Sequence, residues 1–205
     1  MDKNIIAELE NYIFEYKPKP VVAADAMADI IGVMIGVKPA AIIGRIITKE
    51  TVKTDPINLI EHLNRANLKA LLFMHNFFSM GEMIWNEDIY ISRDLETAAK
   101  LRQLFEQLRD SMDDAGQIFD RKTWEESSRE IGHLLGYPDT AVDYFIAEQD
   151  VDNKERKQLM KRYQFYVHSP KHHEEEHRAY DQKIFQALEE YAPKSAKLLL
   201  EDKSH

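Results

Sequence analysis

Residues 21–47 have the sequence VVAADAMADIIGVMIGVKPAAIIGRII and form the most apolar part of the chain. A membrane-spanning helix needs about 20 consecutive apolar residues. Four charged residues interrupt this stretch and a proline divides it, so we expect no membrane span. The interrupting residues are Asp25, Asp29, Lys38, Arg45 and Pro39.

Gly36 and Pro39 mark a boundary inside this stretch. Glycine is common just after the last helical residue, and proline is favoured at the first position of a helix. The pattern therefore predicts one helix over 21–37 and a second over 39–47. Residues 30–47 are also rich in β-branched side chains, and short apolar runs fit strands as well as helices. A strand within 30–47 is the open alternative.

The longest predicted helix starts at Pro56 and stops before Gly81. From Leu68 onwards it is apolar nearly all round, and includes Phe73 and Phe77. A helix that is apolar on every side is typically surrounded by other helices. We therefore expect residues 56–80 to form the central helix of the fold.

The rest of the chain predicts helices, because it carries repeated cap and stop signals and only 7 glycines. The exception is a short β-hairpin near residues 83–91, where Asn86-Glu87-Asp88 separate two apolar triplets. The expected fold class is all-α, a compact bundle of about eight to nine helices. We expect one helical domain over 1–205, with two helical halves, 1–112 and 120–205, as the alternative.

Composition narrows the classes of function. Asp and Glu total 36 against 27 Lys and Arg, which gives a net charge of −9. A negatively charged surface repels the phosphate backbone of a nucleic acid, so we expect no nucleic-acid partner. The absence of cysteine excludes disulfides, thiolate zinc sites and cysteine nucleophiles. No basic segment followed by an apolar stretch opens the chain, so we expect no secretory signal and a cytoplasmic protein.

Half of the 8 histidines lie within ten positions near the end of the chain. They are His168, His172, His173 and His177. The segment from His173 to His177 matches H-E-x-x-H, in which two histidines one helical turn apart bind zinc and the glutamate activates a metal-bound water. This pattern makes His173 and His177 candidate ligands of a divalent metal such as zinc. His168 or His172 would be the third ligand, and Glu174 or Glu176 the base.

Two observations favour a structural role for the same histidines. Zinc-protease helices, which this segment resembles, carry mostly apolar residues between the glutamate and the second histidine, whereas Glu175 and Glu176 stand here. At about 100° per residue, both imidazoles also fall on the apolar stripe of the helix that continues through Ile184. Half-buried histidines bonded to neighbouring side chains would show the same pattern.

Two further polar features lie in apolar surroundings. Asp25 and Asp29 form an i, i+4 carboxylate pair on a face shared with Gly32 and Gly36. The pair would suit acid–base work or cation binding, but a solvent-facing side, or a close helix contact through small residues with Arg45 nearby, gives the same pattern. His75 lies within the predicted central helix, where a hydrogen-bonded core histidine is expected.

Phosphate-loop, dinucleotide-binding and α/β-hydrolase motifs are absent from the sequence. We therefore expect a binding or regulatory protein that self-associates, as a homo-oligomer, or docks a protein partner through the apolar helices of residues 21–80. The basis is that two adjacent helices over 21–47 are too apolar for a single surface layer. The alternative is a metal-dependent, hydrolase-like enzyme that uses the histidine cluster of residues 168–177.

Overall fold

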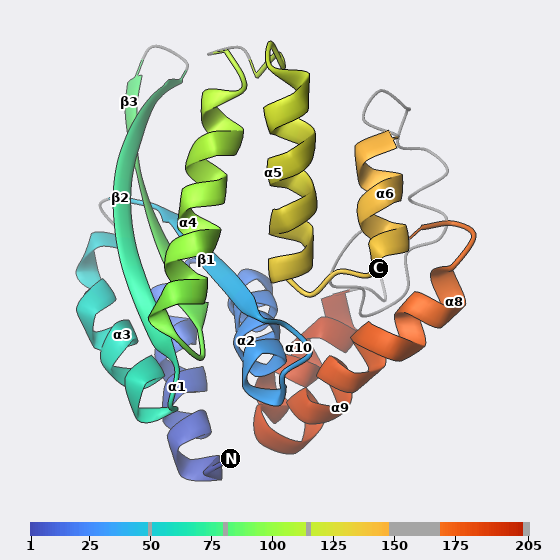
Figure 1. The fold of residues 1–205 in the computed structure, drawn as a ribbon. Coiled ribbons are helices and arrows are strands. Elements are labelled where there is room, and N and C mark those ends of the chain that lie inside the picture. Colours follow the sequence, from blue (N-terminus) through green and yellow to red (C-terminus); the bar gives the residue numbers. More distant parts are fainter. Residues whose placement is uncertain (49–50, 80–81, 114–115, 148–168, 203–205) are drawn as a thin grey trace.

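The computed structural model describes residues 1–48, 51–79, 82–113, 116–147 and 169–202 (Figure 1). These residues form an α+β fold, in which helices cover both faces of a three-stranded antiparallel sheet. The strands are β1 (Ala40–Ile46), β2 (Lys69–Ser79) and β3 (Glu82–Ser92), in the spatial order β1-β3-β2. The predicted all-α bundle is therefore wrong.

The helices are α1 (Lys3–Tyr16), α2 (Pro20–Ile35), α3 (Pro56–Arg65), α4 (Leu95–Asp110), α5 (Arg121–Leu134), α6 (Asp139–Ala147), α8 (His173–Glu176), α9 (Gln182–Tyr191) and α10 (Pro193–Asp202). A 3₁₀ turn, η1 (Thr51–Lys53), precedes α3, and a π-helical turn, η2 (His177–Asp181), joins α8 to α9. Within the described ranges, no helix is long and apolar enough to cross a membrane.

The segment predicted as the central helix, residues 56–80, is instead a helix followed by a strand. α3 ends at Arg65, and Asn67 then adopts φ 60°, in the left-handed region that asparagine tolerates better than most residues. The strand β2 is rich in Ala, Leu and Met, which favour helices locally. Antiparallel pairing of β2 with β3, from Lys69 opposite Ser92 to Ser79 opposite Glu82, overrides that preference.

The predicted hairpin near 83–91 is wrong in its extent and in its turn. Asn86, Glu87 and Asp88, expected to form the turn, lie in the middle of β3, which is the central strand of the sheet. The polar residues are accommodated there because each carboxylate meets a cation or an imidazole on a neighbouring strand. Glu87 lies opposite Arg45 of β1, and Asp88 approaches His75 of β2.

The central helix of the fold is α2. Pro20 occupies its first position, and Gly36, with φ 78°, ends it, so the helix predicted over 21–37 is confirmed. The second helix predicted, over 39–47, is wrong, since β1 occupies Ala40–Ile46 and the strand alternative holds there. α2 packs against α1, α9, α10 and the sheet, which accounts for its apolar residues within a single chain.

The sheet separates two cores. The main core lies between one sheet face and α1, α2, α3, α9 and α10, and includes Leu9, Ile30 and Leu188, all fully buried. The second core lies between the opposite face and α4 with α5, and includes Tyr90 and Leu101. A small cluster of apolar residues, among them Trp124, joins α5 to α6.

A buried ion pair fastens the sheet to α1 and to η1. Arg45 Nε lies 2.9 Å from Glu87 Oε1, and both side chains are 3% exposed. Arg45 also donates to the carbonyl oxygens of Thr51 and Thr54, at 2.9 and 2.7 Å, while Tyr16 donates its hydroxyl to Glu87. Each charged group is thus hydrogen-bonded, which a buried ion pair requires if it is not to destabilise the fold.

Candidate functional site

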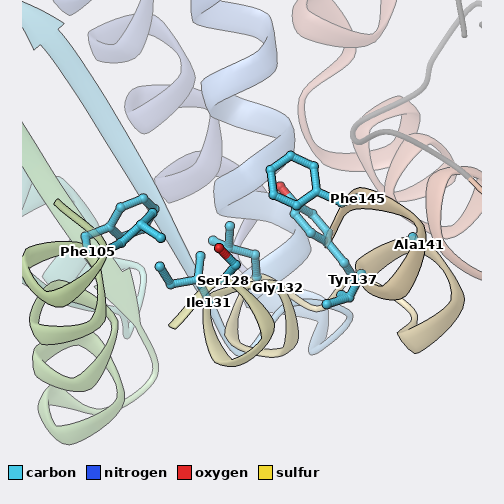
Figure 2. Close-up of a pocket in the computed structure, with 10 residues that line it drawn as sticks. Phe105, Ser128, Ile131, Gly132, Tyr137, Ala141 and Phe145 are labelled. Carbon is cyan, nitrogen blue, oxygen red and sulfur yellow. The ribbon is translucent and has the colours of Figure 1, made fainter. Parts of the chain in front are cut away.

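An apolar cavity of about 340 Å³ lies between α4, α5 and α6 (Figure 2). Its lining, as far as the described residues form it, is almost entirely aliphatic and aromatic, with no charged side chain. The lining residues are Phe105, Leu108, Ser128, Ile131, Gly132, Leu135, Tyr137, Ala141, Val142 and Phe145.

Helical periodicity places these residues on the cavity wall. The α5 side is formed by residues at steps of three and four from Ser128 to Leu135, and the α6 side by the steps from Ala141 to Phe145. Small residues face the larger ones, so the space between the helices is not filled by side chains. In Figure 2, Phe105 and Phe145 stand on opposite sides of Ser128, Ile131 and Gly132.

Gly132 sets how closely α5 and α6 approach. A Cβ atom at this position would lie 2.6 Å from Val142 Cγ2, well inside van der Waals contact. Glycine in the middle of a helix destabilises it by about 1 kcal/mol relative to alanine, so such a residue requires a packing reason. Contact with Val142 supplies that reason.

The mouth of the cavity is marked by Phe145, which is 41% exposed. Its ring stacks on Trp124, with 6.2 Å between ring centroids. Ser128 is buried, and it and Tyr137 are the described lining residues that carry a hydroxyl group. A bound molecule would therefore meet mostly hydrocarbon, with hydroxyl groups on Ser128 and Tyr137.

Behind Tyr137 lies a buried polar cluster. The Lys38 ammonium pairs with Asp29 and lies 5.7 Å from the Tyr137 ring centroid. Burial lowers the pKa of Lys38. The neighbouring Asp29, Tyr137 and Asp181 raise it by more than burial lowers it, so the net pKa lies above the ordinary value. Burial also raises the pKa of Tyr137, and Lys38 opposes part of that rise. Lys38 is therefore a buried cation that is held by its ion pair with Asp29.

The histidine cluster is only partly assembled in the structure. His173 and His177 are both buried and their rings stack, with 6.3 Å between centroids. His177 Nδ1 lies 2.9 Å from Asp181 Oδ2, within η2. His172 is exposed, and His168 lies outside the described residues.

The two candidate bases lie in different surroundings. Glu174 is exposed, on the outer side of α8. Glu176 is buried and accepts hydrogen bonds from Thr140 Oγ1 at 2.5 Å and from the Ser169 amide at 2.9 Å, so it joins α6 to the start of α8. Among the described residues, no group of three His, Asp or Glu side chains is arranged to hold a metal ion.

The other polar residues singled out from the sequence are in structural contacts. Asp29 pairs with Lys38, while Asp25 is exposed. His75 lies on β2 and not in a helix, with Nδ1 3.5 Å from Asp88 Oδ2. Burial raises the pKa of Asp88, and His75 partly opposes the rise.

The cavity residues were not identified from the sequence. The sequence feature that could have indicated the cavity is a glycine in the middle of a helix, Gly132, with the small residue Ser128 one turn before it on the same face of α5. Comparisons with protein-family models, with curated proteins and with solved structures found no match for this chain. The function is therefore argued from this geometry alone.

The contact between α5 and α6 generates a stability prediction. Gly132→Ala should destabilise the protein by about 1–3 kcal/mol, because overpacking against Val142 outweighs the better helix propensity of alanine. In a Val142→Ala background, the same substitution should stabilise the protein. Urea unfolding of the four proteins measures both effects, and equal effects in the two backgrounds would contradict the close contact.

Proposed function

We propose that this protein binds a small, neutral, largely apolar molecule in the cavity between α4, α5 and α6. The observation that carries the proposal is the cavity itself, about 340 Å³ in volume and lined by aliphatic and aromatic side chains. Ligand pockets in proteins span about 300–1,000 Å³ and combine an apolar lining with few polar groups. The cavity has such a lining, and its volume lies near the lower end of that range.

The lining selects the chemistry of the ligand. An ionised group inside the cavity would lose its hydration without meeting an opposite charge, which disfavours carboxylates and amines. An alkyl or aryl group instead gains about 25 cal/mol for each Å² removed from water. A single hydroxyl or carbonyl group on the ligand can hydrogen-bond to Ser128. We therefore expect neutral alcohols, ketones or similar molecules to bind better than their charged analogues.

Titration with straight-chain 1-alkanols, from hexanol to decanol, tests this proposal. Trp124 stacks on Phe145 at the mouth of the cavity, and Trp85→Phe leaves Trp124 as the single tryptophan. We expect a saturable change in Trp124 fluorescence. Each added methylene should tighten binding about fourfold, as about 0.8 kcal/mol of burial implies, until the chain outgrows the cavity.

A matched pair of substitutions on α5 locates the binding. Ser128→Leu places a larger side chain in the cavity and should abolish the saturable signal, with Ala141→Leu as a second filling variant from α6. Glu126→Leu adds a similar side chain at an exposed position of the same helix and should leave binding unchanged. Circular dichroism verifies that each variant is folded. Parent-like affinity in folded Ser128→Leu and Ala141→Leu would refute binding at this site.

A divalent-metal site is the second candidate function. The observation in its favour is the hydrogen bond between His177 Nδ1 and Asp181, since metal-binding histidines are commonly oriented by a carboxylate on the other ring nitrogen. His173 lies beside His177, and His168 or His172 would complete the ligands. With Glu174 as base, the site would support metal-dependent hydrolysis.

Metal analysis of the untagged protein tests this second candidate. An occupied site predicts about one zinc per chain, because structural and catalytic zinc sites bind one ion each. The His173→Ala/His177→Ala variant should then lose that zinc. A parent protein with no zinc after incubation with zinc and desalting would end this second candidate, and would leave the cavity proposal unaffected.

A further inference from the structure

The chain segment that carries the histidine cluster contacts two of the three helices around the ligand cavity. From η2, Tyr180 donates its hydroxyl to the carbonyl oxygen of Leu135, at 3.0 Å, and Leu135 lines the cavity at the end of α5. From α8, Glu176 accepts a hydrogen bond from Thr140, in the first turn of α6. The segment is thus bonded to both of these cavity walls.

The bond from Tyr180 holds the end of α5. Leu135 is the C-cap residue of this helix, and carbonyl groups at a helix end lack intrahelical partners. Tyr180, which is 3% exposed, supplies a donor to one of them from another element. The next residue, Gly136, lies so close to Val37 that a Cβ would be 2.4 Å from the Val37 carbonyl oxygen. The wall residue Leu135 is therefore held between two neighbouring segments.

Tyr137 is the second wall residue in contact with η2. Its ring meets the Tyr180 ring edge-on, with 6.1 Å between centroids. The Lys38 ammonium lies 5.7 Å from the Tyr137 centroid and 6.0 Å from the Tyr180 centroid, so the three side chains pack together. Tyr137 also packs against each of the three apolar clusters of the fold. A shift of Tyr180 therefore reaches the cavity through Tyr137 as well as through Leu135.

A hydrogen bond within η2 supports Tyr180. His177 Nδ1 lies 2.9 Å from Asp181 Oδ2, and both residues are buried. They flank Tyr180 in the π-helical turn, which the bond from the Gln182 amide to the His177 carbonyl oxygen closes. Turns of this kind are rare and recur at functional sites. His177, a candidate metal ligand, is thus linked by packed side chains to the cavity wall.

We propose that η2 controls ligand affinity in the cavity. Tyr180 is the positioning residue and holds the wall residues Leu135 and Tyr137, while the bond between His177 and Asp181 holds Tyr180. The inference rests on the proposed ligand binding and adds the regulation of that site. A coupling free energy between two sites is reciprocal. A change at His177 therefore alters ligand affinity, and bound ligand alters the surroundings of His177.

Titration with 1-octanol, followed by Trp124 fluorescence in the Trp85→Phe background, tests the proposal. Tyr180→Phe removes the hydroxyl and keeps the ring. It should weaken 1-octanol binding about two- to tenfold, because the wall must then be ordered on binding without one hydrogen bond. His177→Leu should weaken binding in the same way. His177→Asn keeps an N–H donor near the Nδ1 position and should retain the parent affinity.

Tyr16→Phe is the matched control. Tyr16 is 1% exposed and, like Tyr180, donates its hydroxyl to a buried acceptor, but its partner is Glu87 of the sheet. This variant should lower the free energy of unfolding in urea and leave 1-octanol affinity unchanged. Circular dichroism verifies that each variant is folded.

The outcomes separate this inference from the ligand proposal. Parent affinity in folded Tyr180→Phe and His177→Leu would overturn the inference and leave ligand binding standing. Equal weakening by Tyr16→Phe would also overturn it. A parent protein without any saturable signal would refute ligand binding itself, and this inference with it.

NMR of the histidine rings in the parent protein gives a second readout, which a purely stabilising role of Tyr180 would not move. 1-Octanol should shift the ring signals of His177 over the concentrations that change the Trp124 fluorescence. His62 of α3, in contact with Tyr12 on the main-core side of the sheet, should keep its shifts. An unchanged His177 signal at saturating 1-octanol would overturn the proposal.

Discussion

The fold depends on the burial of most of α2. An apolar helix with few polar positions is stable only if other elements cover most of its surface. Here the sheet covers one side and α1, α9 and α10 cover the others, so residues from both ends of the chain share the main core. Gly32 shows how close this packing is, because a Cβ there would lie 2.7 Å from a Lys38 side-chain carbon. The Lys38 side chain, which is buried and pairs with the partly exposed Asp29, lies in the space that this glycine leaves.

The cavity exists because the helices on the other face of the sheet pack less completely than the helices around α2. α4 covers that face and α5 packs on α4, while α6 packs mainly on α5. α6 therefore has a single well-packed neighbour among the described elements, at the contact of Gly132 with Val142. Away from this contact, small side chains such as Ser128 leave room between the helices. The structure thus combines a filled main core with a peripheral one that leaves a cavity between its helices.

Sequence reasoning located α2 and the start of α3, because Gly36 and Pro56 are local signals of a helix end and a helix start. It missed the sheet, because β2 begins with helix-favouring residues such as Ala70, Leu71 and Leu72, and its strand conformation depends on pairing with β3, a non-local contact. It left His173 and His177 as either candidate metal ligands or half-buried structural residues. The structure shows that both are buried, and metal binding stays a prediction. It could not identify the cavity, since that depends on the distance between two helices and not on any local pattern.

The most direct test of ligand binding is an NMR titration of methyl-labelled protein with 1-octanol. Ligand in the cavity predicts saturable shifts, and ligand-to-protein nuclear Overhauser effects, at methyl groups of Ile131, Leu135 and Val142. Methyl groups of Leu9 and Ile30, deep in the main core, should stay unchanged. Shifts concentrated in the main core, or no saturable shift at the cavity residues, would contradict the account.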